Sequence, residues 1–104
     1  MGKIDMTRFL YIVRCNEFYK IGISDNVKNR MFGMQTDNPY KLELIVSVQG
    51  PCDAISRFEK RLHKSLKKWN IQGEWFALTE NELTILTEQC TTFEKFFRHD
   101  SHDK

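Results

Sequence analysis

Residues 9–24 read FLYIVRCNEFYKIGIS, and the rest of the fold can be worked out from this stretch. Two runs rich in aromatic and β-branched residues, 9–14 and 18–23, lie on either side of the polar segment Cys15-Asn16-Glu17. Such residues favour strands, and two strands joined by so short a polar segment form a hairpin. The sequence therefore predicts an antiparallel β-hairpin.

The length of the hairpin loop determines which side chains share a face of the two strands. A two-residue loop at Asn16-Glu17 places Tyr11 opposite Gly22 and Val13 opposite Lys20, all on one side. A three-residue loop would separate Tyr11 from Lys20. Gly22 has two interpretations, which are a kink at the strand end and a missing side chain that lets a ligand approach opposite Tyr11.

A short helix and a third strand are predicted after the hairpin. Ser24 can cap a helix whose apolar residues recur at helical spacing up to Gln35. The stretch 36–39, TDNP, ends this helix because proline lacks an amide hydrogen and restricts the residue before it. Apolar and polar residues then alternate over 41–48, which is the period of a half-buried strand.

Two further helices are predicted on either side of a short extended segment. Asp53 is the expected cap of a helix that runs to Trp69, in which apolar residues three or four positions apart define one buried face. Residues 74–78, EWFAL, are expected to form a short strand. Thr79 and Glu82 then make the capping-box pattern that begins a last helix.

The predicted order β-β-α-β-α-β-α describes a small α/β fold, a mainly antiparallel sheet with helices packed on it. The 104 residues fit one domain, 1–104, with a core at 8–98 and frayed ends at 1–7 and 99–104. No apolar run approaches the ~18 residues of a membrane span, and the N-terminus lacks the apolar stretch of a secretory signal. We expect a cytoplasmic location, or a nuclear one in a eukaryotic or viral setting, without secretion or membrane contact.

The three cysteines do not indicate a disulfide framework or a zinc site. Cys15, Cys52 and Cys90 are odd in number and far apart in the chain. We therefore expect reduced thiols, with Cys90 in the core of the protein.

Basic residues are concentrated in one segment. The net charge of +2 is too small to indicate nucleic-acid binding by itself. Six of the sixteen Lys and Arg residues nevertheless lie within 53–69: Arg57, Lys60, Arg61, Lys64, Lys67 and Lys68. On a helix they form a flank that either binds phosphates or is only a solvated face. Glu59 and His63, four residues apart in the same helix, are either a local polar contact or part of a site.

Several segments together resemble the GIY-YIG nuclease superfamily. They are FLYIVR, YKIGIS, the arginine eight residues beyond Gly22, MQTDNP, FEKRLHKSL and GEWFAL, and they cover roughly residues 8–78. The resemblance is narrower to the compact phage, viral and fungal branch, which includes the meiotically upregulated gene family. Each segment is weak alone, but their shared order is specific.

The resemblance implies a role for each matching residue. Tyr11 occupies the tyrosine that closes the GIY motif, and Lys20 stands where YIG has its tyrosine. Arg30 matches the arginine of the first helix, Glu59 matches the glutamate that holds a divalent metal, and His63 is typical of the compact branch. These five are the expected catalytic residues, with Mg²⁺ or Mn²⁺ bound at Glu59.

The implied function is metal-dependent hydrolysis of phosphodiester bonds by an endonuclease, with DNA as the expected substrate. Arg30 would clamp phosphate oxygens, and Tyr11 would act as general base. Lys20 would lower the pKa of Tyr11 or bind the phosphate, unless it is a solvated strand lysine. The expected substrate-binding residues are Gly22, Arg14, Lys60, Lys64 and Lys67.

Two departures from the family pattern bear on substrate choice. Phe9-Leu10 replaces Gly-Ile, and we expect no separate DNA-recognition domain. A homodimer or a partner protein could supply specificity, because one small module buries little surface. The alternative function is a non-catalytic nucleic-acid-binding module that uses the basic helix 53–69.

Overall fold

The computed structural model describes residues 6–102, with side chains described up to residue 97. The elements along the chain are β1 (Thr7–Cys15), β2 (Phe18–Ser24), α1 (Val27–Thr36), β3 (Glu43–Pro51), α2 (Cys52–Ser65), the 3-10 turn η1 (Lys67–Trp69), β4 (Asn70–Gln72), β5 (Trp75–Ala77) and α3 (Glu80–His102). No helix of this described part has the length and apolar character needed to cross a membrane.

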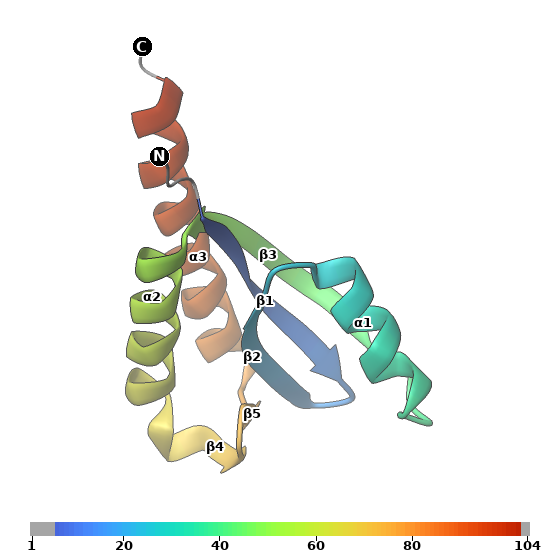
Figure 1. Cartoon of the computed structure of the whole chain (residues 1–104). Coiled ribbons are helices and arrows are strands. Elements are labelled where there is room, and N and C mark those ends of the chain that lie inside the picture. The colour runs from blue at the N-terminus through green and yellow to red at the C-terminus, as the bar shows by residue number, and fades with distance from the viewer. Residues whose placement is uncertain (1–5, 103–104) are drawn as a thin grey trace.

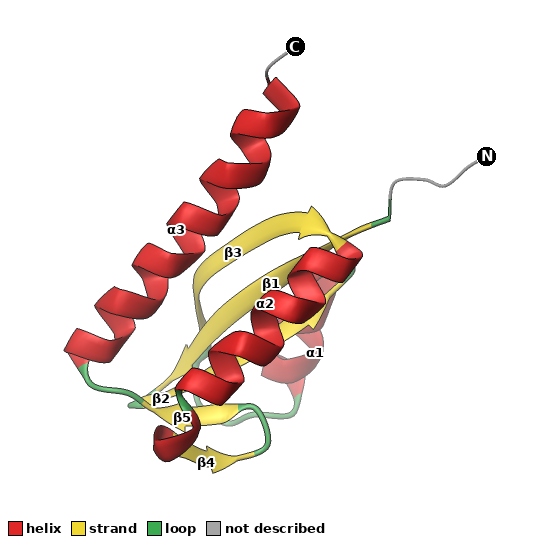
Figure 2. Ribbon diagram, turned by 90° about the vertical axis from the view of Figure 1, so that its left-hand side faces the viewer, coloured by secondary structure: helices red, strands yellow, loops and turns green. Residues whose placement is uncertain are grey.

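One antiparallel sheet organises the molecule, with the strand order β3-β1-β2-β5-β4. Helix α1 covers one face of the sheet, and α2 and α3 lie on the other (Figures 1 and 2). The predicted fold class is therefore confirmed. The main core lies between the sheet and α2 and α3, and a smaller cluster lies under α1.

The hairpin has the two-residue loop that a site at Tyr11 and Lys20 requires. Tyr11 pairs with Gly22 and Val13 pairs with Lys20. Asn16 in the turn has a φ of 59°, a left-handed conformation that asparagine tolerates better than most residues. The side chains of Tyr11 and Lys20 thus lie on the α1 side of the sheet.

Some element boundaries differ from the prediction. The cap of α1 is Asn26, whose side chain accepts a hydrogen bond from the Asn29 amide at 3.0 Å. Ser24 instead accepts from the Asn26 amide at 3.0 Å, which forms the turn before the helix. Helix α2 begins directly after Pro51, so Asp53 lies in its first turn rather than at its cap. Strand β4 and η1 were not predicted.

The two ends are more regular than expected within the described residues. Thr7 is already part of β1, and α3 continues to His102. The remaining residues predicted to fray include 1–5 and 103–104, which lie outside the described residues. The predicted capping box is confirmed, because the Thr79 amide donates to Glu82 at 3.0 Å and the Glu82 amide donates to Thr79 at 3.3 Å.

The cysteines are free thiols, as predicted. Cys90 is fully buried in the main core, and burial raises the pKa of its thiol to about 12. It is therefore a packing residue rather than a reactive one.

Candidate active site at the open edge of β2

Because β5 is short, part of the edge of β2 has no neighbouring strand. The two strands pair only from Phe18 to Lys20 of β2. Beyond that point the Ile21 amide donates to the Glu74 carbonyl at 3.0 Å, and the Ile21 carbonyl lies 2.9 Å from His63 Nε2. We call this place beyond Lys20, where β2 has no neighbouring strand, the gap. Here side chains of α2, on one face of the sheet, come close to side chains on the α1 face.

Tyr11 brings a buried hydroxyl to this gap from β1. The residue is fully buried, and among the described residues its hydroxyl makes no hydrogen bond. A Cβ at position 22 would lie 2.6 Å from Tyr11 Oη and 2.8 Å from Glu74 Oε1. Gly22 is therefore required because these two oxygens occupy the space of its missing side chain. The interpretation as a kink at the strand end is wrong, since Gly22 lies inside β2. The approach of a ligand opposite Tyr11 stays a prediction.

The surroundings of Tyr11 favour the neutral phenol. Burial raises its pKa, and the negative charges of Glu74 and Glu59 act in the same direction. The Arg30 guanidinium, from α1, opposes them electrostatically without a hydrogen bond of ordinary geometry. Arg30 is thus a cation that favours the phenolate, a role that we expected of Lys20.

Lys20 has a different partner. Its Nζ lies 3.2 Å from Glu74 Oε1 and 5.6 Å from the centre of the Trp75 ring. Only 19% of its side chain is exposed. Lys20 is therefore held in the gap by Glu74 and Trp75, and the interpretation as a solvated strand lysine is wrong.

Glu59 and His63 approach the gap from α2. Glu59 Oε2 lies 3.7 Å from His63 Nε2, and the Glu59 side chain is 16% exposed. Burial raises the pKa of Glu59, and the adjacent Glu74 raises it further, while His63 and Arg8 oppose the change. His63 Nε2 lies nearer to the Ile21 carbonyl than to Glu59. Its main contact therefore joins α2 to β2.

Two residues of this cluster were not predicted as site residues. Glu74 pairs with Lys20 and raises the pKa of Glu59. Arg8 forms an ion pair with Asp25 at 3.0 Å and lowers the pKa of Glu59. Arg8, Asp25 and Arg30 line one shallow pocket beside the gap. The GEWFAL segment was a signal for Glu74, whereas nothing in the sequence distinguished Arg8.

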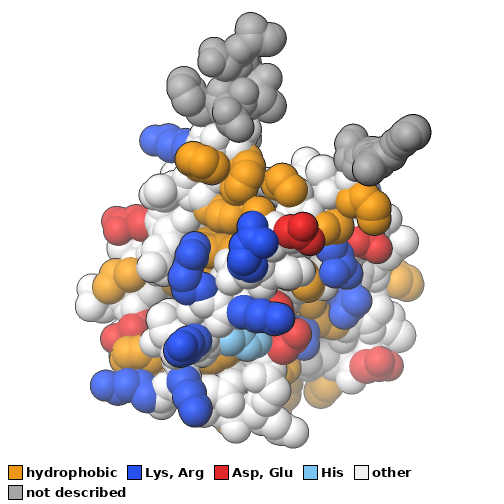
Figure 3. Space-filling model, turned by 60° about the vertical axis from the view of Figure 1, so that its left-hand side comes forward, with side chains coloured by type: hydrophobic (Ala, Val, Ile, Leu, Met, Phe, Trp, Pro, Cys, Tyr) orange, Lys and Arg blue, Asp and Glu red, His pale blue; other side chains and the backbone are white. Residues whose placement is uncertain are grey.

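Not every predicted binding residue lies at the gap. Arg14 lies near the hairpin turn, where its Nε donates to the Asn16 carbonyl at 2.9 Å and its guanidinium lies 6.0 Å from the Tyr19 ring centre. It is therefore apart from Tyr11 and Lys20. Four lysines are exposed along α2 and η1, the three predicted ones and one more: Lys60, Lys64, Lys67 and Lys68. Figure 3 shows basic side chains gathered on this side of the molecule.

The gap has oxygen donors of the kind that Mg²⁺ and Mn²⁺ prefer. Glu59 supplies a carboxylate, and the unpaired Tyr11 hydroxyl could bond to a water of a hydrated ion. Among the side chains that the structure describes, residues 6–97, no three of His, Cys, Asp or Glu form a metal cluster. Mg²⁺ commonly needs only one or two carboxylates and keeps several waters, so these residues fit it.

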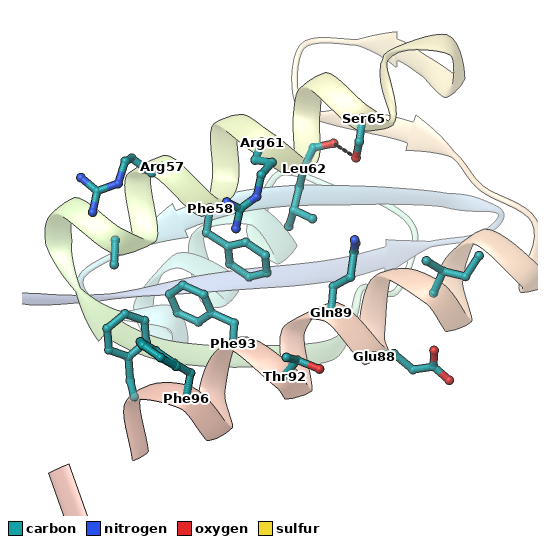
Figure 4. Close-up of a pocket in the computed structure, with 13 residues that line it drawn as sticks. Arg57, Phe58, Arg61, Leu62, Ser65, Glu88, Gln89, Thr92, Phe93 and Phe96 are labelled. Atoms are coloured by element: carbon teal, nitrogen blue, oxygen red, sulfur yellow. Dashed lines mark hydrogen bonds between the residues drawn. The ribbon is translucent and has the colours of Figure 1, made fainter. Parts of the chain in front are cut away.

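Another cavity lies on the other flank of α2. It is an apolar groove between α2 and α3, and none of its lining residues belongs to the gap (Figure 4). Within it the rings of Phe58 and Phe93 stack with their centres 4.3 Å apart.

Comparison with known protein families identifies the family of this chain. The family model described as the T5orf172 domain matches residues 8–91, which is most of the chain. The chain belongs to the T5orf172 domain family. This family is associated with nuclease-like domains of phages, and the matched range contains the cluster around Tyr11, Lys20 and Glu59. No curated protein and no solved structure matches this T5orf172 domain.

Proposed function

We propose that this T5orf172 domain is a metal-dependent endonuclease of the GIY-YIG type that hydrolyses phosphodiester bonds, with DNA as its substrate. The observation that carries the proposal is the buried hydroxyl of Tyr11, which has no hydrogen-bond partner among the described residues. It lies in a gap that also contains the charged groups of Arg30, Lys20 and Glu59. Phosphodiester cleavage needs cations for the phosphate oxygens and a group that orients the attacking water.

Arg30 and Lys20 are the phosphate-binding groups of this proposal. A guanidinium presents a planar fork that matches two phosphate oxygens, and Arg30 is exposed in α1 beside the gap. Lys20 is held by Glu74 and faces the same gap, so its ammonium can approach a phosphate that enters there. Together the two cations would balance the charge that develops on the phosphate.

Tyr11 would orient the attacking water, and its phenolate form, which Arg30 favours, would receive the proton of that water. Because burial raises the pKa of this phenol, the neutral form prevails at neutral pH, and Arg30 supports the phenolate only in part. The neutral hydroxyl can orient a water by a hydrogen bond, and the proton is transferred only to the fraction of Tyr11 that is ionised. General-base assistance of this kind contributes about 10²- to 10⁴-fold in rate.

Glu59 is the residue that would hold the metal. A Mg²⁺ bound there would neutralise charge on the phosphate and stabilise the leaving oxygen. His63 fixes the position of α2 against β2 and so keeps Glu59 at the gap. His63 is then a positioning residue.

Plasmid nicking tests the proposal. The wild-type chain with Mg²⁺ or Mn²⁺ is expected to convert supercoiled DNA to the nicked form, and EDTA is expected to stop it. Glu59→Gln and Arg30→Ala should each lower the rate at least about 10²-fold, while circular dichroism remains unchanged. Arg61→Ala, on the groove flank of α2, is the matched control for charge. Absence of cleavage by the wild type, or full activity of both variants, would reject the proposal.

A non-catalytic nucleic-acid-binding module remains the second candidate, favoured by the exposed lysines of α2 and η1. The slope of binding against salt would then report the number of phosphate contacts, at about 0.9 per contact on duplex DNA. Replacing Lys60, Lys64 and Lys67 by Gln should reduce that slope. Under this candidate Tyr11→Phe has no effect, and no cleavage depends on a metal.

A further inference from the structure

Glu74 is a charged group at the gap to which the proposed mechanism assigns only the holding of Lys20. It follows Gly73, whose φ of 55° turns the chain between β4 and β5. Its carbonyl accepts a hydrogen bond from the Ile21 amide at 3.0 Å. This contact fixes the backbone of residue 74 against the open edge of β2, so the carboxylate is presented to the gap by the sheet itself.

The Glu74 carboxylate lies between a cation and another carboxylate. Its Oε1 is 3.2 Å from Lys20 Nζ, and its side chain is 40% exposed. Glu74 also lies near enough to Glu59 for its charge to raise the pKa of the Glu59 carboxyl. Two adjacent carboxylates repel each other when both are ionised, and a divalent cation between them removes that repulsion.

The Tyr11 hydroxyl is a second, independent indication of a ligand. It is buried without a hydrogen-bond partner among the described residues. Tyr11 Oη and Glu74 Oε1 both lie within 2.8 Å of the point where a Cβ of residue 22 would stand, so they face the same small volume. Buried hydroxyls are ordinarily satisfied, and a water carried by a hydrated cation would satisfy this one.

We propose that Glu74 is a second carboxylate ligand for the divalent cation, and that it forms the cation site jointly with Glu59. The proposal rests on the proposed function and adds a ligand to it. In the absence of the cation, Lys20 pairs with Glu74. When the cation binds, Lys20 is released from Glu74 and becomes available to the substrate phosphate.

Binding of Mn²⁺ to the full chain without nucleic acid tests the second ligand. Electron paramagnetic resonance of free Mn²⁺ gives the dissociation constant directly, with no reference to activity. Glu74→Gln should weaken binding about 10- to 100-fold, since even residues behind a metal ligand have effects of this size. Glu59→Gln should do the same. Glu17→Gln, which removes one carboxylate from the exposed hairpin turn, is the matched control and should bind as the wild type does.

Lys20→Gln provides a second measurement in the opposite direction. Because the variant removes the cation that competes for Glu74, it should bind Mn²⁺ more tightly than the wild type while cutting DNA more slowly. This variant keeps both carboxylates, so it tests the proposal even if Glu74→Gln fails to fold. If Lys20→Gln binds Mn²⁺ no more tightly, competition at Glu74 is refuted.

The outcomes separate the second ligand from the proposed function. If the wild type binds Mn²⁺ and nicks DNA, Glu59→Gln does neither, and a folded Glu74→Gln binds Mn²⁺ with wild-type affinity, the role of Glu74 is refuted and the proposed function stands. If the wild type neither binds Mn²⁺ nor nicks DNA, both proposals fall.

Discussion

The two flanks of α2 differ in almost every physical respect, although they belong to the same helix. On one flank, Glu59 and His63 meet the polar gap at the edge of β2. On the other, Phe58 stacks against Phe93 of α3 at the side of an apolar groove, and Arg61 lies at that groove too. Basic residues occur on both flanks, so their number says little about which flank has a function. The groups that face each flank from the sheet or from α3 make the difference.

The largest expected effect concerns the Tyr11 hydroxyl on the gap side. Tyr11→Phe should lower the single-turnover nicking rate about 10²- to 10⁴-fold if the phenol assists the attacking water. The free energy of unfolding in urea should hardly change, because the hydroxyl that is removed makes no hydrogen bond within the described residues. A wild-type rate in this variant would remove Tyr11 from the mechanism.

Phe93→Ala probes the groove side and should give the opposite combination. Loss of the ring stacked on Phe58 should lower the free energy of unfolding by about 2–4 kcal/mol, which is below the upper range for phenylalanine because Phe93 is only partly buried. The nicking rate per folded molecule should be unchanged. A large loss of rate at full folding would show that the two flanks are coupled.

Two glycines allow a steric clash to be compared with a substitution that meets no neighbour. Gly22→Ala would bring a Cβ within 2.6 Å of Tyr11 Oη, so either the phenol or the strand must move. We expect a rate loss of about 10²-fold, the usual consequence of misplacing a catalytic group by about 1 Å. Gly33→Ala, in α1, meets nothing within 4 Å and should instead stabilise the fold by about 0.5–1 kcal/mol. Equal rates for the two variants would contradict this steric account.

The smallest effect is a shift in titration that NMR can follow on labelled glutamate carboxyl carbons. Burial and Glu74 raise the pKa of Glu59 above its ordinary 4.5, against His63 and Arg8. A raised pKa means that this group stabilises the fold fully below 4.5 and that the contribution is lost as the pH rises through the raised value. Glu74→Gln should lower the Glu59 midpoint. Glu82, whose pKa is lowered by its hydrogen bonds to Thr79, should titrate below 4.5 and serves as the internal reference.

Much of the fold was predictable because it depends on local patterns. The two-residue loop determines the register that puts Tyr11 opposite Gly22, and the apolar spacing of α2 predicts its buried face. The start of α1 was placed wrongly because Ser24 and Asn26 are both good capping residues. The turn at Ser24 decides between them, and that choice requires coordinates.

The candidate site was predictable only in part. Tyr11 and Lys20 follow from the hairpin, but the role of Glu74 depends on where β5 stops pairing with β2, which no spacing rule gives. Arg8 is similar, because its influence on Glu59 joins residues 51 positions apart in sequence. Arg14, although polar and close to the hairpin turn, was included because strand position alone does not tell distance from Tyr11.

Strand length has a consequence for how such a domain could be altered. Three pairs join β2 to β5, and the backbone beyond them is occupied by His63 and the Glu74 carbonyl instead of by a neighbouring strand. Additional residues that lengthen β5 would cover the gap with main chain and would exclude a nucleic acid from it, while the hydrophobic core would be unchanged. Under the proposed function, the number of residue pairs between β2 and β5 would therefore determine whether a nucleic acid can reach the gap, without any change to a charged side chain.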